Sequence, residues 1–190
     1  IYGTNANKWE PGDKNPPLYK VMLFTRRDGA YREYMPLKIG FGKTELVDGR
    51  LTRFDKELKL VKAGYNAAAD RKTTLAELKA LKAKGNNTIC PDYPQPGWFY
   101  DLCDELGLYV IDCANINAPE KRDDRKVGGT PSNDPSLADE YLERVKAMYY
   151  RSRNHSCVIA FALGGESGNG YNMYKAYEWL KSCLLYTSPS

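Results

Sequence analysis

Residues 153–170 have the sequence Arg-Asn-His-Ser-Cys-Val-Ile-Ala-Phe-Ala-Leu-Gly-Gly-Glu-Ser-Gly-Asn-Gly, and this stretch decides the fold. Seven consecutive non-polar residues, from Cys157 to Leu163, end in two glycines and the carboxylate of Glu166. A short apolar run bounded by turn residues is typical of a strand buried on both faces, as in a parallel sheet. The stretch therefore predicts a buried strand with one acidic side chain at its carboxyl end.

From residue 58 onward, strand patterns alternate with helix patterns, which predicts a parallel sheet with helices between its strands. The predicted strands are residues 58–64, 87–90, 108–111 and 157–163. The predicted helices begin at Thr74, Trp98, Asp134 and Tyr171, and the last is expected to end at Lys181. Four such units are half of a (β/α)8 barrel, whose catalytic groups lie at the carboxyl ends of its strands. Glu166 is therefore the first candidate for a catalytic residue.

Local signals set the expected helix boundaries. Thr74 and Glu77 have the spacing of a capping box, which predicts that the first helix begins at Thr74. Gly85 and Gly107 stand where the first two helices are expected to end. Asp134-Pro135 supplies an N-cap and a first-turn proline for the third helix.

The first part of the chain has a β pattern instead. Residues 18–25 and 31–39 are predicted strands, and Arg27-Asp28-Gly29-Ala30 is a tight hairpin turn between them. A second hairpin signal spans Leu46–Leu51. We therefore predict an α/β fold in which the last strands of a β-sandwich, residues 1–45, precede the N-terminal half of a TIM barrel, residues 52–182.

Both ends of the chain look artificial by pattern. Ile1 stands within a strand pattern without an initiator Met, and Cys183–Ser190 resembles a translated sequencing-library adapter. We therefore expect residues 183–190 to be a non-native tail and the rest to be an internal fragment. The alternative is a genuine polar tail.

Composition narrows the class of protein. The chain has 190 residues with 28 basic and 24 acidic side chains dispersed along it, so neither a nucleic-acid stripe nor a polybasic membrane patch is predicted. Five cysteines without a paired spacing predict reduced, buried thiols. A single His argues against a metal site, and 15 Tyr against five Phe favours half-polar surfaces such as carbohydrate sites.

The four predicted strand ends bring two carboxylates, several amides and two tyrosines to one face. Those segments are residues 64–66, 90–94, 113–117 and 165–167. A carboxylate among amides and aromatic rings suits glycoside hydrolysis, which uses one carboxyl group as the acid and another as nucleophile or base. Glu166 suits the acid, and we do not assign the second role to Asp92, the other carboxylate on that face. A Ser/His/Asp triad is not expected, because His155 precedes its strand and lies at the opposite end.

At this point the sequence resembles a family. Several ordered motifs are similar to the family 2 glycoside hydrolases of β-galactosidase type: Tyr93-Pro94, the run Phe99–Asp112, Ala114-Asn115-Ile116, Arg153-Asn154-His155, and Leu163–Gly168. Leu18-Tyr19 and Ile39-Gly40-Phe41 resemble the closing strands of the immunoglobulin-like sandwich that precedes the barrel in that family.

The resemblance implies a retaining glycosidase acting on β-galactosides or related β-glycosides. Glu166 matches the acid/base glutamate, and the nucleophile is a second Glu on a seventh strand, expected beyond Ser182, so the fragment alone is expected to be inactive. Carbohydrate is the expected partner, a homo-oligomer of the full-length protein is left open, and so is the compartment, cytoplasm or periplasm of a bacterial-type cell. The candidate substrate-binding residues are Asp92, Tyr93, Asn115, Asn117 and Gly165.

This chain departs from the family pattern at several site positions. Gly165 stands where an Asn that binds the sugar 2-hydroxyl is usual, and Cys113 where Glu is frequent. Asn117 and Pro119 replace a metal-binding Glu and His, so no cofactor is expected, the Mg²⁺ of the family included. Ile89 and Asp92 replace an Arg and a His. These departures leave a second hypothesis open, a catalytically inactive carbohydrate-binding or scaffold paralogue.

Other polar residues are expected to be structural. We expect His155 to satisfy backbone groups at the entrance of its strand, and Asp112 to be buried as a helix cap or in a salt bridge. Cys90 and Cys113 are expected to be packed thiols at neighbouring strand ends. Asp92 and Asn117 either line the sugar pocket or cap loops. Tyr93 and Trp98 either stack on a sugar or pack at the rim.

Overall fold

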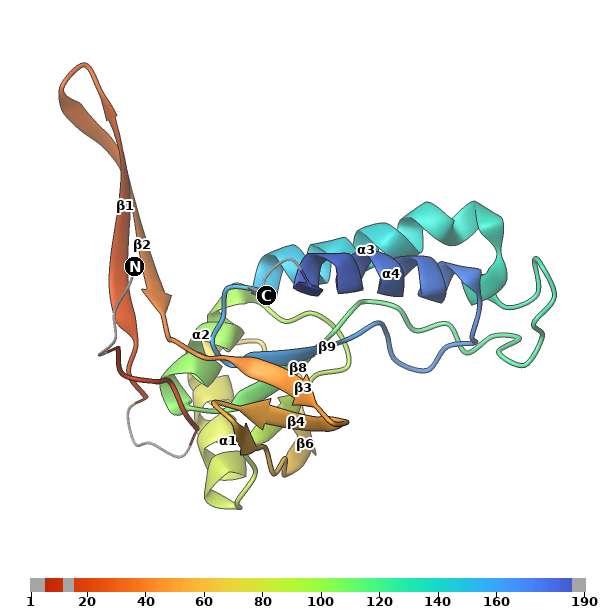
Figure 1. Ribbon diagram of the computed structural model, residues 1–190, viewed down its shortest axis with the longest axis horizontal. Coiled ribbons are helices and arrows are strands. Elements are labelled where there is room, and N and C mark those ends of the chain that lie inside the picture. Colours follow the sequence, from red (N-terminus) through yellow and green to blue (C-terminus); the bar gives the residue numbers. More distant parts are fainter. Residues whose placement is uncertain (1–5, 12–15, 186–190) are drawn as a thin grey trace.

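The computed structural model describes residues 6–11 and 16–185 (Figure 1). Its strands form a two-stranded, a three-stranded and a four-stranded sheet. The four-stranded sheet holds β6 (Lys62–Gly64), β7 (Thr88–Cys90), β8 (Tyr109–Cys113) and β9 (Val158–Ala162) in that order, every neighbour parallel. Ile1 and residues 186–190, which carry the predictions of artificial ends, lie outside the described residues.

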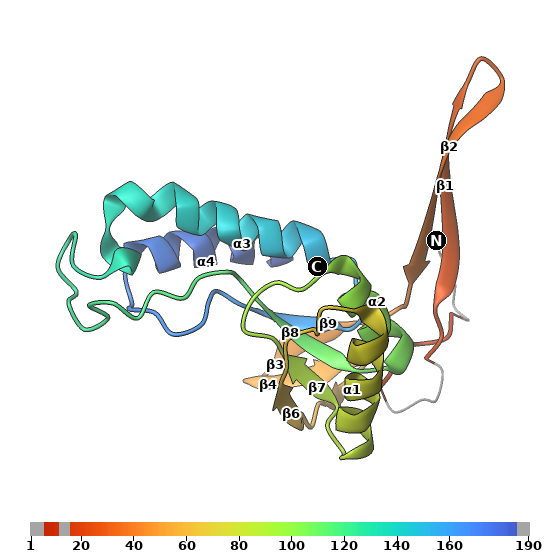
Figure 2. The same cartoon turned by 180° about the vertical axis from the view of Figure 1, so that it is seen from behind.

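Helices connect the parallel strands as the alternation predicts. They are α1 (Arg71–Ala83), α2 (Gly97–Leu106), α3 (Ala138–Ser152) and α4 (Tyr171–Leu185). Two 3-10 turns, Pro131–Asn133 and Pro135–Leu137, lead into α3. Figures 1 and 2 show α3 and α4 lying side by side, while α1 and α2 cover the first strands of the sheet. Helix α4 runs four residues past the expected end at Lys181, into the segment predicted as a tail.

The predicted start of the first helix is wrong. Asp70, not Thr74, is the N-cap of α1, and its carboxylate accepts a hydrogen bond from the Thr73 N–H at 2.9 Å. The Thr74 hydroxyl instead accepts from the Ala68 N–H, and Glu77 accepts from the Tyr65 hydroxyl. Asp is as good an N-cap as Ser or Thr, so the helix gains one more turn at its start.

The first and last strands of the sheet also differ from expectation. Strand β6 has three residues instead of seven, because Leu58 and Leu60 pack on the core outside the sheet. Strand β9 is not buried on both faces: only Ile159 is fully buried in it. As the last strand in the order, β9 has a neighbour on one side, so its burial is incomplete.

The N-terminal part forms two hairpins. Strands β1 (Tyr19–Arg27) and β2 (Ala30–Ile39) pair antiparallel across the predicted turn, where Asp28 and Gly29 have φ angles of 52° and 79°. Strands β3 (Thr44–Val47), β4 (Arg50–Arg53) and β5 (Lys56–Glu57) form the three-stranded sheet. Both predicted hairpins are therefore confirmed.

The β1–β2 hairpin projects away from the rest of the chain (Figures 1 and 2). Large apolar side chains lie exposed on it: Tyr19, Met22, Leu23, Phe24, Tyr31, Tyr34, Met35 and Leu37. A contiguous exposed apolar surface marks a contact with another part or partner. This agrees with the assignment of residues 1–45 to a β-sandwich, which stays a prediction together with the other domain limits.

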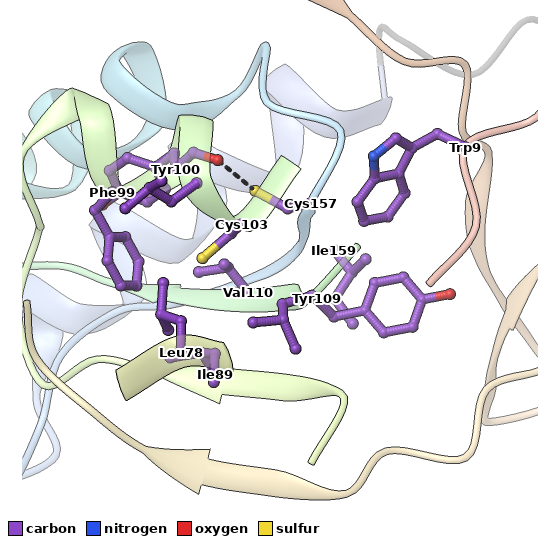
Figure 3. Packing of buried hydrophobic residues seen from close by; sticks show 12 residues of the cluster. Trp9, Leu78, Ile89, Phe99, Tyr100, Cys103, Tyr109, Val110, Cys157 and Ile159 are labelled. Atoms are coloured by element: carbon purple, nitrogen blue, oxygen red, sulfur yellow. Dashed lines mark hydrogen bonds between the residues drawn. The ribbon is translucent and has the colours of Figure 1, made fainter. Parts of the chain in front are cut away.

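Two clusters of buried side chains form the interior. The first lies between the parallel sheet and helices α1 and α2, and Figure 3 shows its members converging on Val110. Trp9, from the N-terminal segment, belongs to this cluster, with its ring centroid 5.9 Å from that of Tyr109. The second cluster holds α3 and α4 against the end of the sheet, around Val145, Met148 and Leu180. The N-terminal segment is thus built into the core of the α/β part.

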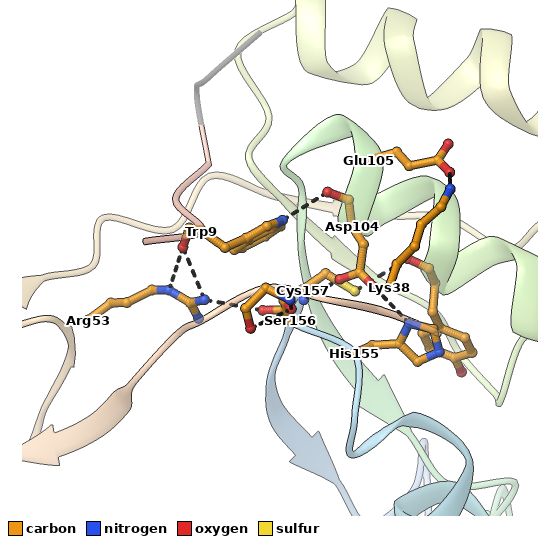
Figure 4. Close-up of polar contacts among 10 residues, drawn as sticks. Trp9, Lys38, Arg53, Asp104, Glu105, His155, Ser156 and Cys157 are labelled. Carbon is orange, nitrogen blue, oxygen red and sulfur yellow. Dashed lines mark hydrogen bonds and ion pairs between the residues drawn. The ribbon is translucent and has the colours of Figure 1, made fainter. Parts of the chain in front are cut away.

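A set of buried polar contacts fastens the N-terminal part to the amino ends of the strands (Figure 4). We call Trp9, Arg53, Asp104, His155 and Ser156 the amino-end clasp. One oxygen of the Asp104 carboxylate accepts from the backbone N–H just before β9, at 2.7 Å, and the other lies 2.7 Å from Nδ1 of His155. The indole N–H of Trp9 donates to the backbone oxygen of Asp104, and the Arg53 guanidinium donates to the backbone oxygens of Trp9 and Ser156.

The clasp corrects one expectation about His155. The residue is structural in position, at the entrance of β9, but its ring contacts the Asp104 carboxylate instead of backbone groups. The backbone N–H at this entrance is satisfied by Asp104 itself. Asp104 of α2 therefore accepts the backbone hydrogen bond that the sequence analysis assigned to His155.

No helix in the described part of the chain is both long enough and apolar enough to span a membrane.

Candidate active site

Glu166 lies in the loop that follows β9, and its side chain is exposed. The backbone around it is held on both sides by the loop that follows β8. The Glu166 oxygen accepts from the Ala118 N–H at 2.9 Å, and the Gly165 N–H donates to the Ile116 oxygen at 2.7 Å. The Ser167 hydroxyl also accepts from Ala118. A fixed backbone with a free carboxylate, beside a parallel β8–β9 pair, is what an acid at a strand end requires.

Gly165 and Asn117 lie against each other at this loop pair. A Cβ atom added at Gly165 would lie 3.9 Å from the Asn117 carboxamide and 3.8 Å from the Ile116 oxygen, both ordinary contact distances. Both residues are exposed. The structure thus brings Asn117, Gly165 and Glu166 together, as the sequence predicts for three of its candidate site residues.

Asp92 belongs to a separate hydrogen-bonded group that joins the loops after β6 and β7. Its carboxylate Oδ2 accepts from the Asn66 amide at 2.8 Å, and its N–H donates to the Asn66 side-chain oxygen at 2.9 Å. Gln95 donates to that same Asn66 oxygen at 3.3 Å, while its own side-chain oxygen accepts from the Ala67 N–H at 2.7 Å. We call Asn66, Asp92 and Gln95 the loop cradle.

Cys90 and Cys113 end the two central strands β7 and β8, and both are free thiols. Burial, helped by the nearby carboxylates of Asp112 and Asp92, raises the pKa of Cys113 to about 11. Burial also raises the pKa of Cys90. Both side chains are therefore neutral thiols at pH 7, a poor state for nucleophiles or metal ligands.

Tyr93 and Asn115 line a different hollow from the residues around Glu166. A shallow pocket there is bounded by Tyr93, Pro94, Asn115 and three residues of α3, Arg144, Ala147 and Arg151. Arg144 donates to the backbone oxygen of Asn115 at 2.7 Å, and Arg151 to that of Gln95 at 3.4 Å. Trp98, at the start of α2, is half-buried. The roles of Tyr93, Asn115 and Trp98 toward a sugar stay predictions.

Asp112 has no exposed surface, and its side chain contacts α2 instead of the strand-end face. One carboxylate oxygen accepts from the Tyr100 hydroxyl at 2.8 Å and from the Cys113 N–H at 3.0 Å. Burial raises the pKa of Asp112 above its usual range. The expected buried structural role is found, with a hydroxyl and a backbone N–H as partners instead of a helix cap or a salt bridge.

Sequence reasoning missed Gln95, although it is the single glutamine of the chain and stands between two prolines. The residue is 2% exposed, and its side chain contacts the loops after both β6 and β7. The available signal was its place between Pro94 and Pro96, where a long amide side chain can hydrogen-bond to the backbone of neighbouring loops. Asp104 was missed as well, because nothing in its helical context marks a carboxylate as buried.

Within residues 6–11 and 16–185, no three His, Cys, Asp or Glu side chains gather where they could hold a metal ion. The two positions that the family resemblance assigns to metal ligands hold Asn117 and Pro119. Mg²⁺ binds through carboxylate oxygens and water, and the Pro119 side chain has no donor atom. This donor set does not fit the ion.

Comparison with known proteins now identifies the class. Residues 64–184, more than half of the chain, match the TIM barrel domain of the glycosyl hydrolases family 2. The chain therefore belongs to this family, and the predicted α/β fold with half of a TIM barrel is confirmed.

The curated relatives are β-galactosidases. The chain is 33% identical over 180 residues to the β-galactosidase of Vibrio cholerae, which covers 89% of this chain and 17% of that protein. It is 34% identical over 194 residues to the β-galactosidase of Lactococcus lactis, covering 94% of this chain and 18% of that protein. The chain thus spans less than a fifth of the length of these relatives. The resemblance to the β-galactosidase type is confirmed.

Solved structures share the fold. The exo-chitosanase CsxA of Amycolatopsis orientalis superposes with a TM-score of 0.74 at 19% identity, over 97% of this chain and 23% of that one. A β-glucuronidase from Ruminococcus gnavus gives a TM-score of 0.70 at 21% identity, over 95% of this chain and 31% of that one. At these identities the likeness concerns the fold alone.

Proposed function

We propose that this chain is part of a retaining glycoside hydrolase that cleaves terminal β-galactosides or related β-glycosides, with Glu166 as the general acid/base. The observation that carries the proposal is one exposed carboxylate on a clamped backbone at the carboxyl end of β9, in a chain of family 2. The curated relatives support the substrate class, since both are named β-galactosidases.

The reaction needs two carboxyl groups about 5–5.5 Å apart in the retaining geometry. Protonated Glu166 gives its proton to the glycosidic oxygen as the bond to the anomeric carbon breaks, and the aglycone leaves as an alcohol. A second carboxylate, from a further strand of the complete barrel, forms an ester with that carbon. Glu166, now ionised, then takes a proton from the water that hydrolyses the ester, which releases the sugar and restores both groups.

The remaining candidates would hold the sugar. Asn117 beside Gly165 offers an amide next to the acid, and Asp92 offers a carboxylate oxygen from the neighbouring loops. We propose that the site works without Mg²⁺, because Asn117 and Pro119 do not supply charged oxygen ligands. Positioning and proton transfer by side chains then carry the chemistry.

Replacing Glu166 by Gln in the full-length parent tests the assignment. A positioned acid contributes about 10²–10⁴-fold, so hydrolysis of alkyl β-galactosides, whose leaving groups need protonation, should fall by that factor. Hydrolysis of a dinitrophenyl β-galactoside should be limited by the second step, and added azide should restore its turnover. Glu120→Gln, a change at an exposed carboxylate of the loop after β8, is the matched control. Equal rates on alkyl galactosides for wild type and Glu166→Gln would overturn the assignment.

The second candidate function, an inactive carbohydrate-binding paralogue, is favoured by Gly165, Asn117 and Pro119 together. It predicts galactoside binding by the full-length parent without any turnover, and no effect of Glu166→Gln on the dissociation constant. Calorimetric titration with a galactoside beside the activity assay separates the two functions.

A further inference from the structure

A hollow of about 210 Å³ lies between α3 and the loops after β7 and β8, and we call it the α3 hollow. Arg144 and Arg151 stand two helical turns apart on the side of α3 that lines it, with Ala147 between them. The small Ala147 side chain leaves space between the two long ones. The opposite wall consists of Tyr93, Pro94 and Asn115.

Arg144 has a counter-ion of its own. It forms an ion pair with Glu140, one turn earlier on α3, and it donates to the backbone oxygen of Asn115 at 2.7 Å. These contacts hold its guanidinium against the loop after β8. Arg144 therefore shapes the hollow and adds little net charge to it, because the Glu140 carboxylate has the opposite charge.

Arg151 has no such counter-ion. Within the described residues it donates one long hydrogen bond, to the Gln95 backbone oxygen at 3.4 Å, and forms no ion pair. Burial raises the pKa of Asp112, and the charge of Arg151 offsets only part of that rise, so Asp112 does not act as its counter-ion. Among the described residues, no acidic side chain lines the hollow. The hollow therefore has the positive charge of Arg151.

The α3 hollow also offers unused hydrogen-bond donors. A guanidinium has five N–H groups, so the exposed Arg151 side chain keeps most of them free. The Tyr93 hydroxyl and the Asn115 side-chain amide are exposed as well, and neither forms a hydrogen bond within the described part of the chain. One charged donor and two neutral donors at one opening suit an oxyanion, which accepts hydrogen bonds through two or more oxygens.

The hollow is separate from the loop that carries Glu166. Asn115 lines the hollow, whereas Asn117, further along the same loop, lies against Gly165. Ile116, between the two asparagines, is buried in the second core cluster. Neither Gly165 nor Glu166 lines the hollow. A ligand bound there would therefore leave the proposed acid free.

We infer that the α3 hollow binds an oxyanion, a carboxylate, phosphate or sulfate group, with Arg151 as the charged donor and Tyr93 and Asn115 as the neutral ones. This binding site is independent of the role of Glu166. The oxyanion has two possible sources, a free inorganic anion or an acidic substituent on a carbohydrate. The exposed ring of Tyr93, beside Pro94, offers an apolar wall to a sugar that carries such a group.

Thermal unfolding of the full-length parent tests the charged donor, in sodium sulfate and in sodium chloride of equal ionic strength. Bound sulfate should raise the Tm of the wild type, and Arg151→Gln should weaken sulfate binding about tenfold or more and remove most of this rise. Sulfate also stabilises proteins because it is excluded from their surface, but that effect is common to all variants. Arg125→Gln, at an exposed arginine outside the hollow, is the matched control and should keep the whole rise.

A carboxylate built into the hollow should replace the ligand. Ala147→Glu puts an acidic side chain one turn before Arg151, the spacing and order that favour an ion pair on a helix. It should raise the Tm in chloride and abolish the response to sulfate, whereas the neutral Ala147→Gln should leave the Tm in chloride unchanged and still respond. Ala147 is exposed and Glu is a good helix former, so this pair of variants should fold even where Arg151→Gln does not.

The source of the oxyanion is distinguished by comparing glucose 6-sulfate with inorganic sulfate. Tighter binding of glucose 6-sulfate by the wild type, with the advantage lost in Arg151→Gln, assigns the oxyanion to a carbohydrate. Equal binding of the two probes, both weakened in Arg151→Gln, assigns it to a free anion.

Two results would overturn the anion site. One is an equal response to sulfate in wild type, Arg151→Gln and Ala147→Glu, and the other is an equal loss of the response in Arg125→Gln and Arg151→Gln. Either result leaves the proposed function standing, because binding is measured without turnover. Conversely, a parent that hydrolyses no galactoside but shows the Arg151-dependent response overturns the proposed function alone.

Discussion

The two ends of the parallel sheet use the same residue types for opposite purposes. At the amino ends, Asp104 is 3% exposed and both of its carboxylate oxygens have partners within the amino-end clasp. At the carboxyl ends, Asp92 and Glu166 are exposed, and within the described residues each keeps a carboxylate oxygen that accepts no hydrogen bond. A satisfied buried carboxylate fastens elements together, whereas an exposed one on a rigid backbone is available to a ligand. Barrels separate stability and activity in this way.

The largest expected effect contrasts Asp104→Ala with Asp92→Ala. Removing Asp104 leaves the Cys157 N–H and the His155 ring without their acceptor in a buried place, and each such loss costs about 1–3 kcal/mol. We expect the free energy of unfolding to fall by about 3 kcal/mol for Asp104→Ala and by less than about 1 kcal/mol for the exposed Asp92→Ala. Urea unfolding of the chain measures both.

Equal losses for the two variants would contradict the division between the ends. Asp101→Ala, at a half-buried carboxylate of the same helix as Asp104, is the control for helix propensity. It should behave as Asp92→Ala does.

The second contrast lies within the carboxyl end, at two adjacent glycines. A Cβ atom at Gly164 would lie 2.7 Å from the Ile116 oxygen, closer than any real contact, whereas one at Gly165 would meet nothing nearer than 3.8 Å. Gly164→Ala must therefore shift the loop that carries Glu166, with a loss of about 1–3 kcal/mol in stability. Gly165→Ala should change the free energy of unfolding by less than about 0.5 kcal/mol.

Differential scanning calorimetry measures the pair, and the activity of the full-length parent gives an independent reading of loop position. If both alanine variants unfold at the wild-type temperature, the loops after β8 and β9 are not packed as closely at Gly164 as the structure has them.

The order of strands and helices was predictable because it depends on local patterns. The run Cys157–Leu163, the Asp-Gly turns and the glycines after α1 and α2 each fix a boundary through short-range geometry. The start of α1 was missed because Asp70 and Thr74 are both good caps, and only the packing of Thr74 against Ala68 decides between them. A choice between two acceptable caps is made by tertiary contacts.

The residues of the candidate site also divide into those that a local pattern predicts and those that only tertiary contacts reveal. Glu166 was predictable because a strand pattern ends three residues before it, at Leu163. The loop cradle and the amino-end clasp were not, since each joins residues far apart in sequence: Asn66 with Gln95, and Trp9 with Asp104. No periodicity records such a pairing, so only the folded structure reveals that Gln95 and Asp104 are buried polar side chains with several partners.

The smallest expected effect concerns how the free energy of unfolding changes with pH. The direction of that change differs between a buried carboxylate and an exposed one. Burial raises the pKa of Asp112, whereas hydrogen bonds from Thr73 lower the pKa of Asp70, the exposed N-cap of α1. A raised pKa in the folded state adds stability that is complete below the unfolded value, about 3.9, and is lost as pH rises through the folded value. A lowered pKa adds stability that is present above about 3.9 and is lost as pH falls through the folded value.

Asp112→Asn and Asp70→Asn should therefore bend the pH profile of stability in opposite directions. Between pH 3 and pH 7, wild type should lose stability relative to Asp112→Asn and gain it relative to Asp70→Asn, because each Asn keeps the shape and removes the titration. Urea unfolding at several pH values measures the two differences. A wild type that gains stability against Asp112→Asn as pH rises would mean that the carboxylate is charged and stabilised where it lies.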